Sequence, residues 1–212
     1  MARPRAFDEG AVLDAAIQCF WNRGYEATSM RDLIARTGLT AASLYNAFGD
    51  KRSLFEKALA HYVEGRIAER IRRCEALAPR AGIAAYFDEV LARSLDDPEH
   101  KGCMVVNSAL DVAPHDPRLG EAVAEVLGRI ERFFRDCVRR GQADGSITTA
   151  MPADDLARHL LGVLMGVRVL ARARPDRELL AGAIAPALAL LDPAAPEPDP
   201  DDTPMISNPY GH

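Results

Sequence analysis

The stretch MRDLIARTGLTAASLYNAFGDKRSL, residues 30–54, decides the fold of this chain of 212 residues. It contains two short amphipathic segments, 29–37 and 40–47, which meet where Gly38 permits a sharp corner. Ser29 is placed to begin the first segment as a helix N-cap. Such a pair predicts a helix-turn-helix, whose first helix crosses the DNA backbone and whose second lies in the major groove. The pattern alone also allows an ordinary helical hairpin with a polar surface.

The second helix of this unit carries small and polar side chains on its outer faces. Short side chains allow the backbone to approach a groove closely, and hydroxyl or amide groups can bond to base edges or phosphates. An N-terminal arm with Arg3 and Arg5 could enter the adjacent minor groove, or be a basic tip without a role. The remaining candidate DNA contacts on the pattern are Ser29, Thr40, Ala41, Ala42, Ser43, Tyr45 and Asn46.

Residues 15–59, AAIQCFWNRGYEATSMRDLIARTGLTAASLYNAFGDKRSLFEKAL, resemble the N-terminal domain of TetR/AcrR-family transcriptional regulators. The RGYEATS junction, the LYNAF core and the DKRSL segment carry the resemblance. It implies that Tyr45 and Lys51 contact phosphates, and Lys51 also stands beside helix N-terminal amides that attract phosphate oxygens. Many relatives carry a histidine or an aromatic residue where this chain has Asn46 and Ala47. The operator sequence therefore stays open.

Apolar residues recur at intervals of three and four along the chain, which predicts an all-α fold. The helix that Asp50 caps is expected to run from Lys51 toward Ile71. The later helices are expected at roughly 81–96, 103–113, 117–143, 153–173 and 176–191.

The expected organisation has three parts. An N-terminal three-helix helix-turn-helix DNA-binding domain covers residues 1–51. The resemblance implies a C-terminal helical ligand-binding and dimerisation domain over 52–192, and residues 193–212 are a Pro-rich, acidic tail that we expect to be disordered.

Composition narrows the class of protein. The net charge is -5, but residues 1–60 carry a net charge of +1, which is compatible with a DNA-binding end on an acidic body. No apolar run is long enough to span a bilayer and no secretory signal is visible, so we expect a cytoplasmic protein without a membrane partner. The four cysteines fit no disulfide framework. No cofactor is expected.

The resemblance implies a homodimer that releases double-stranded operator DNA when an unknown small-molecule effector binds. The last two helices are apolar around much of their circumference and would pair with those of a second copy. Gly162 and Gly166 would allow close helix approach there, or would only ease packing inside one subunit. The candidate pocket residues, each of which could also be plain core, are Phe87, Leu91, Met104, Asn107, Phe133, Phe134, Cys137 and Met165.

A second reading concerns HKGCMVVNSALD, residues 100–111, which resembles a GCxxVNSALE-like element of a subset of TetR-family regulators. Some of these regulators sense electrophiles or oxidants through a cysteine. Cys103 would stand in the first turn of a helix with Lys101 and His100 nearby, conditions that lower a thiol pKa. The alternative is a small residue that fills a helix N-terminus.

Other chemistry around Cys103 has little support in the sequence. A Cys-dependent enzyme would need His100, His115 or His159 as base, but the chain has no phosphate loop, metal-binding HExxH or nucleophile elbow. A metal sensor built from His100, Cys103 and His115 has no tight ligand spacing. We therefore expect neither an enzyme nor a metal site.

Overall fold

The structure, a computed structural model, describes residues 7–193. Within them the chain is all helical and has no strand, which confirms the predicted class. Arg3, Arg5 and the predicted tail from residue 194 onward lie outside the described residues. In chain order the elements are α1 Glu9–Arg23, α2 Met30–Thr37, α3 Ala41–Phe48, α4 Lys51–Tyr62, the π-helix η1 Val63–Ala68, α5 Glu69–Glu75, α6 Pro79–Leu95, α7 Met104–Asp111, α8 Pro117–Asp144, α9 Ala153–Ala173 and α10 Arg177–Ala189.

Side-chain caps and glycines set the boundaries of α2 and α3. Ser29 is the predicted N-cap and forms a capping box with Asp32, in which the Ser29 hydroxyl accepts from the Asp32 amide and the Asp32 carboxylate accepts from the Ser29 amide. Gly38 ends α2 with φ of 71°, in the left-handed region that glycine enters without strain. Thr40 then caps α3 by accepting from the Ser43 amide at 3.2 Å. The predicted corner is thus confirmed.

The helix-turn-helix is held by an apolar core against α1 and α4. Leu33, Leu44 and Phe48 are fully buried there. Phe20 of α1 meets Phe55 of α4 edge-on, with ring centroids 5.0 Å apart. Because α4 packs on α1, we call residues 9–62 (α1 to α4) the head and residues 63–189 (η1 to α10) the body. The predicted division after residue 51 stays a prediction.

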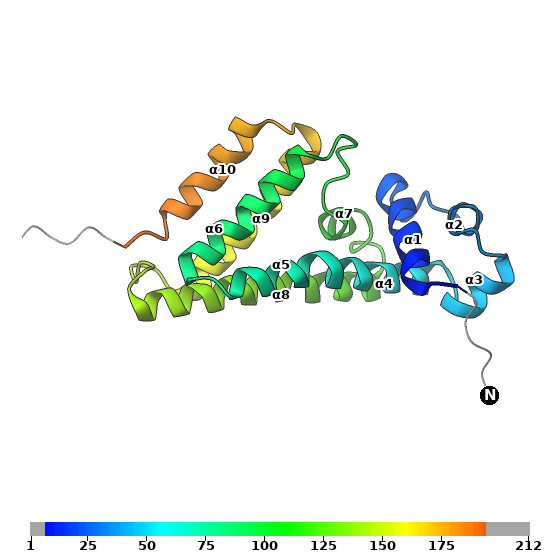
Figure 1. Cartoon of the computed structure of the whole chain (residues 1–212), viewed down its shortest axis with the longest axis horizontal. Coiled ribbons are helices and arrows are strands. Elements are labelled where there is room, and N and C mark those ends of the chain that lie inside the picture. The colour runs from blue at the N-terminus through cyan, green and yellow to red at the C-terminus, as the bar shows by residue number, and fades with distance from the viewer. Residues whose placement is uncertain (1–6, 194–212) are drawn as a thin grey trace, which may run out of the picture.

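The body extends from the head along the long axis of the molecule (Figure 1). The rod formed by α4, η1 and α5 runs beside α8. Helix α6 packs on α5 and α8, α9 packs on α8, and α10 lies on the outside against α9 and α6. The helices predicted after residue 80 correspond to α6 to α10, with ends displaced by two residues or fewer. Among the described residues, no helix has both the length and the apolar character to cross a membrane.

The rod differs from the single helix expected between Lys51 and Ile71. Its middle, Val63–Ala68, is a π-helix, in which each hydrogen bond spans five residues instead of four. Gly65 lies inside this segment, and a Cβ there would meet nothing within 4 Å. Apolar periodicity could not reveal the segment, because Tyr62, Val63 and Ile67 stay on the buried side throughout. The π-helix is the first segment of the body and follows directly on α4 of the head.

Candidate DNA interface, head–body contacts and cavities

The outward surface of α3 is built from small or flat polar side chains. Leu44 and Phe48 anchor the helix in the core. Tyr45, whose side chain would be the largest in a groove, is 49% exposed. The other predicted contact residues that lie exposed in the head are Ser29, Thr40, Ala41, Ala42 and Asn46, with Ser43 half-buried. The structure brings these residues together at the start and outer side of α3, except that Ser29 lies at the start of α2.

Two of these hydroxyls already have partners inside the helix. The Thr40 hydroxyl donates to Ser43 Oγ at 2.9 Å while it accepts from the Ser43 amide. A hydroxyl oxygen has two lone pairs, so Ser43 can still accept from a DNA donor. A DNA donor that bonds to Ser43 would therefore meet a hydroxyl oxygen that Thr40 already holds in place.

Lys51 holds the head together from the N-terminal end of α4. Its Nζ donates to the carbonyl oxygens of Tyr25 at 2.9 Å and Glu26 at 3.4 Å, and lies 4.3 Å from the centre of the Tyr25 ring. An ammonium has three donors, so one remains for a phosphate. Lys51 thus has a structural role that sequence reasoning missed.

Lys57 plays a similar part that sequence reasoning also missed. Its Nζ donates to the Ala47 carbonyl in the last turn of α3 at 3.0 Å and lies 5.2 Å from the Phe48 ring centre. A basic group stabilises a helix C-terminus by binding its unpaired carbonyls. The sequence shows only that a lysine lies in the helix after α3, and lysines are too common in helices to indicate such a contact.

One junction between head and body is ionic. Arg52 on α4 lies 2.7 Å from the carboxylate of Asp116, which is the N-cap of α8 and accepts from the Arg118 and Leu119 amides. Arg118 in turn pairs with Glu56 at 3.3 Å. The start of α8 is therefore tied to α4 twice.

A second junction lies between α1 and the segment before α7. The indole Nε1 of Trp21 donates to the Lys101 carbonyl at 3.0 Å, and Lys101 Nζ donates to Gln18 Oε1 at 3.0 Å. Asn107 Nδ2 donates to the same Lys101 carbonyl at 2.9 Å. Movement of this segment would act directly on α1.

Cys103 is the N-cap residue of α7 rather than a member of its first turn, and it is only 8% exposed. The Tyr62 hydroxyl of α4 donates to its sulfur at 3.8 Å, and burial raises the pKa of Tyr62. The Lys101 ammonium is bonded to Glu99 and Gln18. The structure thus places Cys103 at the head–body junction, among partners other than those expected from the sequence.

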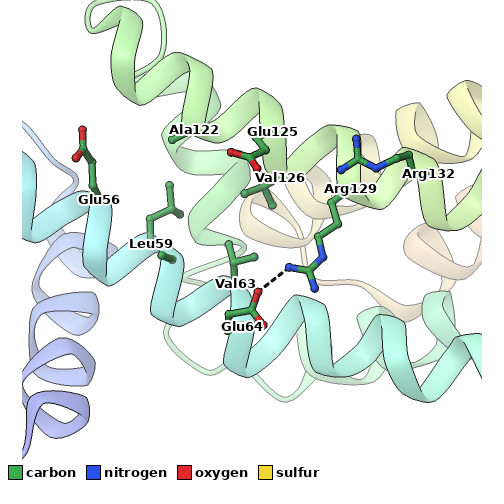
Figure 2. A pocket seen from close by; sticks show the side chains of 10 residues that line it. Glu56, Leu59, Val63, Glu64, Ala122, Glu125, Val126, Arg129 and Arg132 are labelled. Atoms are coloured by element: carbon green, nitrogen blue, oxygen red, sulfur yellow. Dashed lines mark hydrogen bonds and ion pairs between the residues drawn. The ribbon is translucent and has the colours of Figure 1, made fainter.

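The structure shows an open cavity between the rod and α8 (Figure 2). Its volume is about 230 Å³, and Leu59, Val63 and Val126 supply apolar walls. Arg129 crosses from α8 to Glu64 on η1, with an N–O distance of 2.6 Å. None of the predicted pocket residues lines this cavity.

A second cavity, of about 330 Å³, lies where α1, the rod, the segment before α7 and α9 meet. Trp21 and Tyr62 provide aromatic surface. Its cationic lining residues are Arg66, Arg70, Arg93, Lys101 and Arg168, and its acidic ones are Asp96 and Asp97. Sequence reasoning missed this cluster because its members come from four separate segments.

The predicted effector pocket is brought together only in part. Phe87 stacks on Phe134 with ring centroids 5.7 Å apart, and Phe133 packs on both Phe134 and Tyr86, all fully buried. Phe87, Phe133 and Phe134 fill the space between α6 and α8. Together with Leu91 and Cys137 they line neither the cavity between the rod and α8 nor the second cavity.

The other predicted pocket residues lie at two narrow spaces. Met165 lines a small one beside Tyr62 and Cys103, and Met104 and Asn107 line another under Trp21. Effector contact by any of the predicted residues stays a prediction.

Three glycines of α9 and α10 lie exposed on the outer face of these helices. A Cβ added at Gly162, Gly166 or Gly182 would meet nothing within 4 Å, and Val169 is 45% exposed. Packing inside one subunit therefore does not require Gly162 or Gly166 to be glycine. Both lie on the surface that the sequence assigns to a second copy.

Among residues 7–193 there is no group of three or more His, Cys, Asp or Glu side chains that could hold a metal ion. His100, Cys103 and His115 thus do not form the ligand set of the metal-sensor alternative.

Comparison with known proteins matches both halves of the chain. Residues 12–58 match the family described as bacterial regulatory proteins, tetR family, and residues 79–186 match the tetracyclin repressor-like C-terminal domain. The HTH-type transcriptional regulator YezE of Bacillus subtilis (strain 168), itself uncharacterised, is 34% identical over 197 residues, which cover 91% of this chain and 100% of YezE. The transcriptional repressor ComR of Escherichia coli (strain K12) is 29% identical over 180 residues, covering 84% of this chain and 86% of ComR.

A solved structure shares both fold and sequence with this chain. A cysteine mutant of the TetR-family transcriptional regulator CifR, in complex with 26-base-pair double-strand operator DNA, is 37% identical with a TM-score of 0.79. The match covers 88% of this chain and 98% of the CifR chain.

Proposed function

This chain belongs to the TetR family of bacterial regulatory proteins, and we propose that it is a homodimeric repressor that an effector releases from an inverted-repeat operator. As a DNA-binding transcriptional regulator of this family, it is not an enzyme. We expect it to act in the cytoplasm, because its partner is chromosomal DNA.

The observation that carries the proposal is the exposed surface of α3. Backbone can approach base edges closely there, because Ala41 and Ala42 extend no further than a methyl group. Tyr45 and the remaining donor of Lys51 flank this surface and are suited to phosphates. The CifR structure supports operator binding by a chain of this kind.

A second copy would pair through α9 and α10. The glycines of their outer face permit helix axes to approach closely, and burial of Val169 would add apolar contact. Two heads related by a two-fold axis read two half-sites of an inverted repeat.

The head–body junctions supply the route for regulation. An effector that binds more tightly to the head spacing unsuited to DNA shifts the population away from the operator. Such a change can reach α4 through Asp116 and α1 through the Lys101 carbonyl.

The test is titration of the purified protein with labelled duplex DNA from the region beside its own gene, in moderate salt and with random DNA as competitor. Lys51→Ala should weaken binding to every sequence and lower the salt slope by about one phosphate for each head. Ser43→Ala should instead change preference among sequences. Thermal unfolding must accompany Lys51→Ala, because its bonds to the Tyr25 and Glu26 carbonyls are also lost. Equal effects of both variants on every sequence would contradict the assigned roles.

A thiol switch at Cys103 is a second candidate, favoured by its contact with Tyr62 at the head–body junction. Cys103 is only 8% exposed, so modification of its sulfur would displace Tyr62 or α7. Cys103→Ser should abolish DNA release by quinones, aldehydes or hypochlorite and preserve release by a non-reactive ligand. If Cys103→Ser still releases DNA with all three reagents as the wild type does, the thiol switch is rejected.

A further inference from the structure

The second cavity, at the junction of head and body, holds more positive than negative charge. Five cationic side chains line it against the carboxylates of Asp96 and Asp97. Some of this charge is neutralised by neighbours: Glu89 pairs with Arg70 at 3.2 Å, and Glu99 pairs with Lys101 at 2.7 Å. The remaining cations are Arg66, Arg93 and Arg168.

Arg168 is the most unusual of these three. It is 9% exposed, and its one hydrogen bond to a described residue is a 3.3 Å contact from Nη1 to the hydroxyl of Ser94. Removing a guanidinium from water without a carboxylate partner is costly, and a fork of donors directed at a cavity fits the two oxygens of a carboxylate or phosphate.

Arg66 and Arg93 add charge at the open side. Neither forms a hydrogen bond or ion pair with any residue of the described chain. Burial lowers the pKa of Arg93, and the guanidinium groups of Arg70 and Arg66 lower it further. Mutual repulsion of this kind is relieved when an anion binds among the cations.

The cavity also has an apolar wall. The guanidinium of Arg66 lies 5.5 Å from the ring centre of Trp21 and 5.8 Å from that of Tyr62. A volume of about 330 Å³ is at the lower end of the range for small-molecule sites. A ligand that fits has an anionic group and a small apolar part.

We propose that this cavity binds a small organic anion, bearing a carboxylate or phosphate, through Arg66, Arg93 and Arg168. The proposal also identifies this anion as the effector, and that part rests on the proposed function. The site is placed for that role, because Trp21 belongs to α1, Lys101 supplies the carbonyl that Trp21 binds, and Arg66 lies on the π-helix that begins the body directly after α4. A π-helical turn can return to α-helical pairing, which would shift α4 relative to α5.

Trp21 makes the site measurable, because it is the only tryptophan in the chain and lines the cavity. The first experiment compares quenching of its fluorescence by iodide, an anion, with quenching by neutral acrylamide, at constant ionic strength and without DNA. Arg66→Gln should lower the ratio of iodide to acrylamide quenching about two- to threefold, the factor expected from one unit charge 5.5 Å from the ring centre in water with ordinary salt screening. Arg168→Gln should lower this ratio as well. Arg72→Gln is the control, because it removes the same charge from an exposed position on α5 outside the cavity. An equal effect in Arg72→Gln, or no effect in the two cavity variants, would overturn the site.

The second experiment identifies the ligand chemistry with two molecules of the same shape. Phenylacetate should protect Trp21 from iodide at concentrations at least tenfold lower than phenylacetamide, and Arg66→Gln should remove the difference. Equal protection by both would overturn the preference for an organic anion.

The third experiment tests the assignment as effector. Saturating phenylacetate should change operator affinity at least threefold in the wild type and less in Arg66→Gln, and an unchanged affinity would overturn the assignment. Because the quenching measurements contain no DNA, a failed anion site leaves operator binding intact, whereas a failed repressor shows as absent operator binding in every sample.

Discussion

Replacement of Asp116 should separate the two roles of this carboxylate at the junction of head and body. One oxygen caps α8 by accepting from the Arg118 and Leu119 amides at 3.1 and 3.3 Å. The other pairs with Arg52 at 2.7 Å. Loss of a capping side chain costs roughly 0.5–2 kcal/mol, and an ion pair that is partly exposed contributes about 0.5–1 kcal/mol. The Asp116 side chain is 10% exposed but that of Arg52 is 47% exposed, so we take the ordinary range for the pair.

Asp116→Ala loses both interactions and should therefore destabilise the protein by about 1–3 kcal/mol. Asp116→Ser retains a cap and loses only the ion pair, so it should match Arg52→Ala at about 0.5–1 kcal/mol. For a chain of this size these losses lower Tm by roughly 2–4 °C per kcal/mol. The double variant Arg52→Ala with Asp116→Ser should be no less stable than either single variant, because each substitution removes the same ion pair.

The assay is thermal unfolding followed by circular dichroism at one fixed protein concentration, because unfolding of the proposed dimer would depend on concentration. High salt should shrink the cost of Arg52→Ala and leave most of the capping loss in Asp116→Ala. The reasoning is refuted if Arg52→Ala costs as much as Asp116→Ala, or if the two single losses simply add in the double variant.

Three further predictions concern the corner, the thiols and the dimer face. Gly38→Ala should destabilise the head by about 1–2 kcal/mol in thermal unfolding, because φ of 71° strains any other residue although a Cβ would meet nothing within 4 Å; an unchanged Tm would contradict this. Burial raises the pKa of Cys74 and of Cys137 to about 11, so both thiols stay protonated below that pH. They should resist Ellman's reagent in the native protein at pH 8, whereas in denatured protein all four cysteines should react. Rapid labelling of all four cysteines in the native state would contradict this. Gly166→Glu should shift the protein to monomers in analytical ultracentrifugation with little change in helix content, and a dimer of unchanged strength would exclude this face as the interface.

The sequence was most informative where local chemistry sets local structure. Ser29 as an N-cap and Gly38 at the corner define the helix-turn-helix in the sequence, and the structure has both in place. The exposed face of α3 followed from the same reasoning, because burial of Leu44 fixes which side chains point outward.

Contacts between distant segments could not be predicted in this way. The Arg52–Asp116 pair joins residues far apart in sequence, and the cationic cavity combines Arg66 with Arg168 from separate helices. The sequence favours a pocket at Phe87, Phe133 and Phe134 because aromatic side chains often line one, yet the same side chains fill a core equally well. Only the relative placement of α6 and α8 shows that these rings pack on one another.

The most direct test of the central claim is the affinity of Ala42→Glu for the operator, measured by fluorescence anisotropy beside the wild type and Ala143→Glu. Both alanines are exposed on helices, so neither change should alter stability by more than about 0.5 kcal/mol. If α3 enters the major groove in both halves of a dimer, a carboxylate at residue 42 meets phosphates twice, and affinity should fall at least a hundredfold, whereas Ala143→Glu should bind like the wild type. An Ala42→Glu protein that binds operator within threefold of the wild type would contradict the placement of this helix against DNA.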